Sequence, residues 1–521
     1  MMDRDTSTRP IINPWIIAIA VMLSTFLEVL DTSVVNVSLP YIAGGLSATI
    51  DQATWVLTSY LVANAIILPI TGWLANQFGR KRLLITAVTG FTLASLLCGI
   101  APSLPLLVLF RCLQGAFGGS LQPISQAVLL ETFPPQERGK AMAFWGIGVV
   151  VAPILGPALG GFLTSTYSWR WVFYINLPIG IAAIIMTQLF IWDPSYIKPR
   201  SAHVDGWGLG MLAVGIASLQ ILLDKGQEAD WFSSHLMVVL GVLAVVLLAG
   251  FVIWELTTKD PVVHLRVFKD RTYATGVFLM TSLGFVLYGG LVMLPLFMQV
   301  LLGYSAITAG LWTAPRGLGA LIFMPIVGIL MSRKWDSRLL LLIGLVAGSY
   351  GPFMFARFNL STGPWSFFWP QVVQGGGMAF IFVPLTTITM DAIPLKDMGN
   401  ATALFNLMRN LGGAVGISVV TFLVARRQQF HQNRLTSQLG STNPTLAHML
   451  AGFKALMMTR GMDAATAARQ ALAAVYGMVQ QQALLLSYVE VFFLLGTVFL
   501  LMTPLVLLLR RPKSSRSMAA H

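Results

Sequence analysis

Apolar residues fill this chain in runs of about 20 residues, the length that an α-helix needs to cross the hydrocarbon core of a bilayer. Short polar connections separate the runs, and each run predicts one membrane-spanning helix. The fourteen runs begin near Trp15, Ala53, Leu83, Leu104, Ala141, Trp171, Trp207, Leu236, Ala274, Ala306, Leu339, Trp365, Ala401 and Leu484. Because this number is even, both ends of the chain are expected on the same side of the membrane.

The composition agrees with a chain that lies almost entirely in the membrane. Of its 521 residues, 56% are hydrophobic and 10% are charged, with a mean hydropathy of +0.76, whereas soluble domains carry about 25% charged residues. The first run is too long for the apolar region of a signal peptide and leads into further spans, so it is expected to be retained. Cys98 and Cys112 both lie in apolar runs, which argues against a disulfide framework or a zinc site.

The basic residues predict the orientation of the chain. A net charge of +13 and a pI near 10.0 would suggest a nucleic-acid partner for a soluble protein, but here Lys and Arg cluster in alternate connections. This positive-inside pattern places both termini in the cytoplasm and predicts no nucleic-acid partner. The clusters are Arg80, Lys81 and Arg82; Arg138 and Lys140; Lys198 and Arg200; Lys259, Arg266, Lys269 and Arg271; Arg333, Lys334 and Arg338; and Arg510, Arg511 and Lys513.

An internal repeat divides the chain into two related halves. The segment from Gln114 to Ala141 reads against the segment from Gln374 to Ala401 at a constant offset, and the segment from Gly72 to Arg82 recurs from Gly328 to Arg338. We therefore predict an all-α integral membrane protein with two pseudo-symmetric six-helix halves, which are residues 1–195 and 270–511. Two inserted helices, residues 205–258, have no counterpart in the repeat. Paired halves around a central substrate site are a known transporter plan.

One long connection, residues 426–482, is predicted outside the cytoplasm. Leu446, Met449, Leu450, Phe453, Leu456 and Met457 share one helical face there, which predicts an amphipathic helix. A second helix is expected from Asp463, as N-cap, to Met478. This region is expected either to rest on the membrane surface or to dock a partner protein.

Two acidic residues in the first span are the main candidates for chemistry. Glu28 and Asp31 are three residues apart and are expected on one helix face, pointing into the bundle. A carboxyl group removed from water binds protons more readily, and a neighbouring carboxylate strengthens this effect. The pair is therefore expected to carry protons and to attract cationic substrates, unless one acid is held permanently by an Arg or caps a broken helix. No histidine is expected within a span, so protons must use carboxylates.

Three arginines and a Pro-Gly segment accompany these acids. Arg111, in the fourth span, is expected to hold or release the first-span carboxylates, or else to serve as a static hydrogen-bond donor between helices. Arg409 follows Asn406 on one face, and Arg316 is a weaker candidate that could snorkel from near a helix end. A kinked hinge or seal, with tight packing of the fifth span against a neighbour, is expected at Pro153, Gly156, Pro157, Gly160 and Gly161.

Two further groups complete the candidate residues. The segment Gly72, Asn76, Gly79 and Arg80 predicts a turn that either latches the halves together or sets orientation. Polar and aromatic side chains of the spans are expected to line a broad substrate cavity, although ordinary helix packing is the commoner role of any single aromatic residue. The cavity candidates are Asn36, Trp55, Gln114, Phe297, Gln374, Phe405, Asn406 and Arg409.

These segments together resemble the major facilitator superfamily. The stretch from Gly72 to Arg82 is similar to its loop motif, Arg111 with Gln114 and Gly115 to its fourth-helix motif, and Gly156 to Gly161 to its antiporter motif. The inserted pair and the stretch from Leu30 to Pro40 resemble the 14-helix drug:proton antiporters. Trp171–Gly180, Leu223–Phe232 and Trp369–Thr389 resemble the EmrB type of multidrug exporter. One departure is Asn76, where the loop motif usually has an acid.

The resemblance implies alternating access and proton antiport of hydrophobic or cationic toxic compounds across a bacterial inner membrane, with a role in antibiotic resistance. It also implies a tripartite pump with a periplasmic adaptor of the EmrA type and an outer-membrane channel of the TolC type. No cofactor, metal or enzymatic activity is expected, because the chain has no Walker A, His-Glu-x-x-His or Gly-x-Ser-x-Gly pattern. The alternatives are an exporter of fatty acids or another amphipathic metabolite, an uptake symporter of the same fold, and a receptor without transport.

Overall fold

The computed structural model describes residues 13–193, 205–258, 261–439 and 443–510. These residues form helices joined by short turns, with no strand among them. Fourteen helical segments are long and apolar enough to cross a membrane, which confirms the predicted number of spans. The basic residues Lys198, Arg200, Lys259, Arg511 and Lys513, and parts of the predicted domain boundaries, lie outside the described residues.

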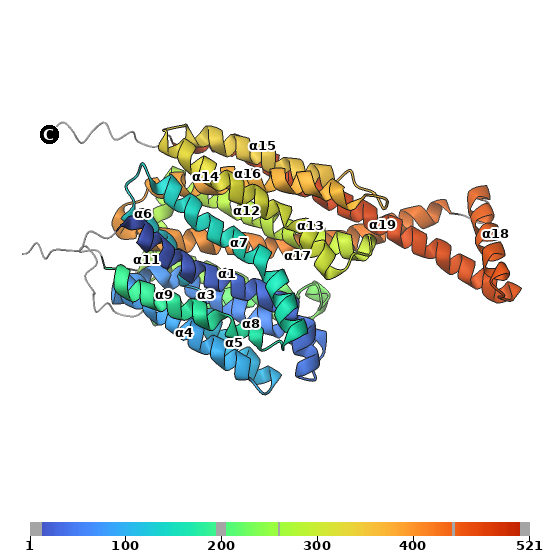
Figure 1. The fold of residues 1–521 in the computed structure, drawn as a ribbon, viewed down its shortest axis with the longest axis horizontal. Helices are drawn as coiled ribbons and strands as arrows, with labels where there is room; N and C mark the ends of the chain where they lie inside the picture. Colours follow the sequence, from blue (N-terminus) through green and yellow to red (C-terminus); the bar gives the residue numbers. More distant parts are fainter. Residues whose placement is uncertain (1–12, 194–204, 259–260, 440–442, 511–521) are drawn as a thin grey trace, which may run out of the picture.

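The first six spans form the N-terminal half of the bundle (Figure 1). Three of these spans are built from two consecutive helices, as at Gly119 between α5 and α6, where an added Cβ would lie 2.6 Å from the Asn64 carbonyl oxygen. The helices are α1 (Pro14–Gly45), α2 (Ile50–Ala53), α3 (Trp55–Phe78), α4 (Arg80–Ile100), α5 (Leu104–Gly118), α6 (Leu121–Thr132), α7 (Arg138–Thr166), α8 (Trp171–Tyr174) and α9 (Asn176–Phe190).

The last six spans form the C-terminal half. Its most buried span contains α16, where glycines allow neighbouring backbones to approach; a Cβ on Gly375 would lie 1.8 Å from the carbonyl oxygen of Arg316. The helices are α12 (Arg271–Leu296), continued by a π-helical turn (Phe297–Leu301), α13 (Ala306–Thr313), α14 (Pro315–Ser332), α15 (Ser337–Phe355), α16 (Phe368–Asp391), α17 (Met398–Gln438), α18 (Pro444–Thr459) and α19 (Ala464–Met502).

The inserted pair, α10 (Gly206–Lys225) and α11 (His235–Thr257), covers one of the two seams between the halves. Helix α10 packs against α3 of the N-terminal half and also contacts α17 of the C-terminal half, while α7 and α14 form the opposite seam. Asp224 binds Thr58 of α3, and Lys225 binds Thr54, the N-cap of α3. The two seams therefore differ, because the inserted pair covers only one of them.

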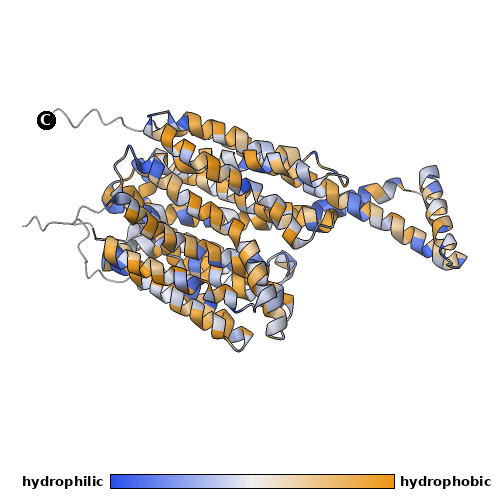
Figure 2. Cartoon of the chain, viewed as in Figure 1, coloured by the Kyte–Doolittle hydropathy of each residue, from blue (hydrophilic) through white to orange (hydrophobic). Residues whose placement is uncertain are grey.

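Two long helices project beyond one end of the bundle and carry α18 at their tip (Figure 1). Helix α17 has 41 residues and is therefore about 61 Å long, roughly twice the thickness of a hydrocarbon core. We call this end the hairpin end. The other end carries Arg80, Arg138 and Arg333 and is called the basic end. Figure 2 shows hydrophilic residues gathered where α17 and α19 leave the bundle.

The structure confirms part of the predicted 426–482 connection and corrects the rest. Helix α18 covers the predicted amphipathic stretch, and Asp463 caps α19 by accepting a hydrogen bond from the Thr466 N–H at 3.1 Å. Hydrogen bonding to the Thr466 side chain and backbone lowers the pKa of the Asp463 carboxyl group. Much of the connection consists of extensions of the spanning helices, because α17 continues through Arg426 to Gln438 and α19 is unbroken from Ala464. His431 consequently lies within a spanning helix, where it contacts Glu490 at 3.0 Å.

Candidate functional site

Asp31 of α1 is the centre of a fully buried polar network in the N-terminal half. One carboxylate oxygen accepts a hydrogen bond from Arg111 Nη1 at 2.6 Å. The other accepts from Gln114 Nε2 at 3.0 Å and from Asn176 Nδ2 at 2.6 Å. The network thus joins α1, α5 and α9. A charge removed from water requires such compensation from opposite charge and hydrogen bonds.

Arg111 is held on several sides. Its Nε donates to the Val56 carbonyl at 3.1 Å and its Nη1 also donates to Gln114 Oε1 at 2.8 Å. The guanidinium lies over the Tyr60 ring, 4.2 Å from the ring centre, an arrangement that stabilises a desolvated cation. Its Nη2 is buried without a hydrogen-bond partner among the described residues.

Glu28 belongs to a different environment from Asp31, although both lie on α1. Glu28 is buried and accepts a hydrogen bond from Asn64 Nδ2 of α3 at 3.0 Å. Its other oxygen, Oε2, accepts no hydrogen bond within the described chain. Gln122 of α6 and Arg409 of α17, which are hydrogen-bonded to each other, also lie near it. The two acids therefore have different partners: Asp31 is paired inside the half, and Glu28 faces the seam.

A layer of polar side chains joins α6 to α17 across the seam. Asn406 Nδ2 donates to Gln126 Oε1 at 2.6 Å, and Arg409 Nη2 donates to Gln122 Oε1 at 2.5 Å. Thr402 adds a hydrogen bond to the Pro123 carbonyl at 3.1 Å. In this conformation Asn406 and Arg409, predicted to line a cavity, connect the halves at a contact from which water is largely excluded.

The Pro-Gly segment of α7 packs tightly against α1. A Cβ on Gly156 would lie 2.1 Å from Ser33 Oγ, and one on Gly160 would lie 2.9 Å from the Val34 carbonyl oxygen. Ser33 also donates to the Pro153 carbonyl at 3.1 Å; a proline at position 157 leaves that carbonyl without its usual helical N–H partner. Gly161, in contrast, has open space around its Cβ position. The close contact therefore depends on Gly156 and Gly160.

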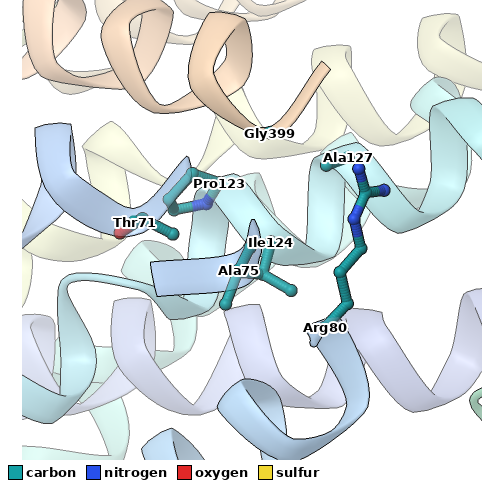
Figure 3. Close-up of a pocket in the computed structure, with 7 residues that line it drawn as sticks. All are labelled: Thr71, Ala75, Arg80, Pro123, Ile124, Ala127 and Gly399. Atoms are coloured by element: carbon teal, nitrogen blue, oxygen red, sulfur yellow. The ribbon is translucent and has the colours of Figure 1, made fainter. Parts of the chain in front are cut away.

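At the basic end the loop motif brings the halves together. A Cβ on Gly72 would lie 2.5 Å from Asn400 Cα, so α3 meets the start of α17 with no room for a side chain. Arg80 forms a buried ion pair with Glu131 of α6, and Figure 3 shows its side chain beside a small hollow that also reaches Gly399. Gly79 has a positive φ of 83°, and Asn76 is exposed.

A second contact at the basic end joins α7 to α16. Arg138 Nη1 donates to Asp391 Oδ1 at 2.7 Å. Close by, Trp145 of α7 is fully buried and stacks on Phe382 of α16, with ring centres 5.9 Å apart. The two halves are therefore closed against each other at the basic end in this conformation.

The other predicted cavity residues are spread over different environments. Asn36 and Trp55 are exposed near the hairpin end. Gln114 is part of the Asp31 network, and Gln374 and Phe405 are buried. Phe297 is enclosed by Phe367, Tyr488 and Phe492 within the C-terminal half, so its surroundings support a packing role instead of the expected lining role.

Sequence reasoning missed polar partners of the acids. They are neutral side chains inside apolar runs, each of which would be costly to bury without a hydrogen bond, and that rarity was the available signal. The missed partners of the acids are Asn64 and Asn176. Gln122 and Gln126, which accept from Arg409 and Asn406, and the Arg138–Asp391 contact were missed as well.

Comparison with known proteins agrees with this architecture. Multidrug export protein EmrB of Escherichia coli (strain K12) is 38% identical to this chain, with 95% of each protein covered. Multidrug export protein EmrB of Haemophilus influenzae is 42% identical over 82% of this chain and 84% of its own length. Fatty acid resistance protein FarB of Neisseria gonorrhoeae is 39% identical over 95% of this chain and 96% of its own length.

Solved structures support the fold. The proton:xylose symporter XylE superposes with a TM-score of 0.59 at 16% identity, covering 94% of both chains. The human organic anion transporter MFSD10 (TETRAN) superposes with a TM-score of 0.59 at 13% identity, covering 94% of this chain and 100% of its own. Residues 21–417 match the family model described as the Major Facilitator Superfamily. This chain is thus a multi-pass membrane protein that belongs to the major facilitator superfamily.

Proposed function

We propose that this protein is a proton-coupled antiporter that exports hydrophobic or cationic toxic compounds across a bacterial inner membrane by alternating access. The basic end faces the cytoplasm in this proposal, in accord with the positive-inside rule. The observation that carries the proposal is the fully buried Asp31–Arg111 ion pair, with Glu28 as a second buried acid at the seam between the halves. Ionisable groups at membrane depth mark ion and substrate pathways.

The geometry suggests how protonation would be coupled to movement. Protonation of Asp31 removes the negative charge that compensates Arg111, so the buried guanidinium must find another partner or gain access to water. Asp31 also holds Asn176 of α9 and Gln114 of α5. Loss of its charge therefore weakens contacts among three helices of one half, which biases how that half packs against its neighbour.

Glu28 is placed to link protons to substrate. Its carboxyl group lies at the seam, with one oxygen that accepts no hydrogen bond within the described chain. A proton and a cationic substrate would compete for this one charge, and such competition is a direct route to exchange. Each charge that crosses about 100 mV supplies about 2.3 kcal/mol, so one or two protons can drive uphill export.

Transport by purified protein in vesicles tests the proposal. We expect Asp31→Asn and Glu28→Gln to abolish pH-driven movement of tetraphenylphosphonium while the protein remains folded. Asp230→Asn is the matched control, because Asp230 is exposed in the loop between α10 and α11 and its removal alters the same formal charge outside the membrane. Uphill export by Asp31→Asn, at the rate of the unsubstituted protein, would contradict the coupling role.

A tripartite assembly is the further part of this proposal. The hairpin of α17, α18 and α19 projects from the bundle (Figure 1), which would place it in the periplasm. Large apolar side chains are exposed on it, and such residues are common at protein contacts. They include Leu456, Met458, Leu472, Tyr476 and Met478. We propose that an adaptor of the EmrA type binds here and connects the transporter to an outer-membrane channel of the TolC type.

The proposed functional units follow the repeat. They are the N-terminal half (1–195), the inserted pair (205–258) and the C-terminal half with its projecting hairpin (270–511). Export of a fatty acid or a similar amphipathic compound is the second candidate function, and the likeness to the fatty acid resistance protein FarB favours it.

A further inference from the structure

The repeat allows the polar site of the N-terminal half to be compared with its counterpart in the other half. Gly72 corresponds to Gly328, so Tyr60 and Arg316, each twelve residues earlier, are equivalent. In the same way Gln114 corresponds to Gln374, and Arg111 and Gln371 lie three residues before them. At these paired positions each half therefore has one arginine, but it lies on α5 in the first half and on α14 in the second.

The acid has no counterpart in the second half. Ser33 of α1 contacts Gly156, and Phe285 of α12 contacts the equivalent glycine, Gly416. Asp31 lies two residues before Ser33, so its equivalent is Leu283, two residues before Phe285. Leu283 is a buried apolar side chain. The C-terminal half thus keeps a membrane-embedded cation and has lost the carboxylate that would compensate it.

The contacts of Arg316 agree with this comparison. Its Nε donates to Gln371 Oε1 at 2.9 Å. Within the described chain no carboxylate lies within 4.0 Å of its guanidinium. Asp391 and Glu490, acids of neighbouring spans, are engaged with Arg138 and Arg427.

Two hydrogen-bond donors at this place are unused. Arg316 Nη1 and Gln371 Nε2 are both buried, and neither has a partner among the described residues. An unsatisfied buried donor costs about 1–3 kcal/mol, and more when it is charged. A carboxylate offers two oxygens and one negative charge, so one such group could accept from both donors and neutralise the guanidinium.

The surroundings of Arg316 favour an amphipathic ligand. The adjacent Gly317 lies against Ile154 of α7, so the site borders the seam that the inserted pair leaves uncovered. Trp312, four residues before Arg316, packs edge-on against Trp365 with ring centres 5.1 Å apart. Apolar and aromatic side chains with a few placed polar groups are typical of small-molecule sites.

We infer that Arg316 and Gln371 form a second recognition site, which binds the anionic head of an amphipathic organic monoanion, such as a carboxylate, during export. This inference rests on the proposed exporter function and assigns a separate binding site to anionic substrates, including the fatty acids of the second candidate function. Glu28 would then select cations at the seam, and Arg316 would select anions in the C-terminal half. An anionic lipid head group has the same chemistry, so the experiment must separate these two sources.

Equilibrium binding to the full-length protein in nanodiscs tests the inference. The probes are radiolabelled dodecanoate and dodecyltrimethylammonium, which share one chain length and differ in charge. We expect Arg316→Gln to weaken dodecanoate binding by about tenfold or more, as for loss of a desolvated charge contact, with less than about a twofold change for the cation. Arg316→Lys should be intermediate, because it keeps the charge without the planar fork.

Arg357→Gln is the matched control, because Arg357 is exposed in the loop between α15 and α16 and should leave both affinities unchanged. Unaltered dodecanoate binding by folded Arg316→Gln would overturn the inference. So would loss of dodecanoate binding when phosphatidylglycerol replaces zwitterionic lipid, since the site would then hold lipid. Failure of the unsubstituted protein to move either probe in vesicles would instead refute the exporter function, which the binding assay alone does not address.

Discussion

Asp31 and Arg111 form an ion pair from which water is excluded, and the two residues therefore depend on each other. Burial of opposite charges is roughly balanced when both are present, but removal of one partner leaves the other without compensation. Gln114 and Asn176 can stabilise a carboxylate without Arg111, whereas Arg111 without Asp31 retains mainly carbonyl and amide acceptors. Loss of Asp31, which leaves Arg111 uncompensated, should therefore destabilise the protein more than loss of Arg111.

The energetic dependence of Asp31 and Arg111 on each other can be measured by a double-mutant cycle. We expect Asp31→Asn to lower the free energy of unfolding by about 3 kcal/mol, the lower end of the range for breaking a buried pair. Adding Arg111→Gln to that variant should restore part of the loss, because the uncompensated cation is gone. Thermal unfolding of the purified variants gives the comparison. Strictly additive losses would mean that the two charges are energetically independent.

At this scale the sequence predicted Arg111 as a partner of the first-span acids, and it missed their neutral partners Asn64 and Asn176. The three-residue spacing of Glu28 and Asp31 correctly predicted that both point into the bundle. Positions three residues apart on a helix are still about 60° apart around its axis, because three steps of about 100° fall about 60° short of a full turn. Which helix each side chain meets depends on tertiary packing, and this separates the environment of Glu28 from that of Asp31.

Helices α1 and α7 illustrate packing at the scale of elements. Membrane helices gain little from the hydrophobic effect between them, so small residues that allow close van der Waals contact carry much of their association. Gly156 and Gly160 supply this surface on α7, and Ser33 adds a hydrogen bond to the carbonyl freed by proline. The contact is both tight and specific.

A single methyl group should disturb this contact. Gly156→Ala would place Cβ 2.1 Å from Ser33 Oγ, and such overpacking typically costs about 1–3 kcal/mol. We expect lower thermal stability and slower substrate export in vesicles. Gly161→Ala is the control on the same helix, because nothing lies within 4 Å of its Cβ position. Equal effects of the two substitutions would argue against a packing origin.

The sequence predicted the helices of the hairpin better than their limits. The end of the apolar run near Arg426 marks where the span leaves the membrane, not where the helix stops. Gln and Arg have a high helix propensity, and residues of this kind continue the helix in water to Gln438. Hydropathy reports the surrounding solvent, and it therefore could not show that α17 and α19 remain unbroken.

The whole molecule is closed at its basic end by contacts between the halves. Gly72 meets the backbone of Asn400, and Arg138 pairs with Asp391. The internal repeat and the family resemblance allowed the two halves to be predicted in detail. They did not reveal which seam the inserted pair would cover, because those helices have no equivalent in the repeat from which a position could be inferred.

Weakening this closure should shift the conformational equilibrium. In Gly72→Ala the new Cβ would lie 2.5 Å from Asn400 Cα. The arrangement closed at the basic end is therefore disfavoured, while an arrangement open at that end is unaffected. Spin labels at the exposed positions 136 and 396, one in each half, should show a larger population of long distances. Gly44→Ala, which meets nothing within 4 Å, is the control. An unchanged distance distribution in Gly72→Ala would show that this contact does not hold the halves together.

The unbroken course of α17 has a mechanical consequence. Arg409, at the contact with α6, and Gln438, at the outer end, belong to the same helix and are 29 residues apart, or about 44 Å. If the helix tilts by about 10° as the halves rock, its outer end moves by about 8 Å. A protein bound to the tip would therefore receive an amplified signal of each turnover, with no flexible segment to absorb it.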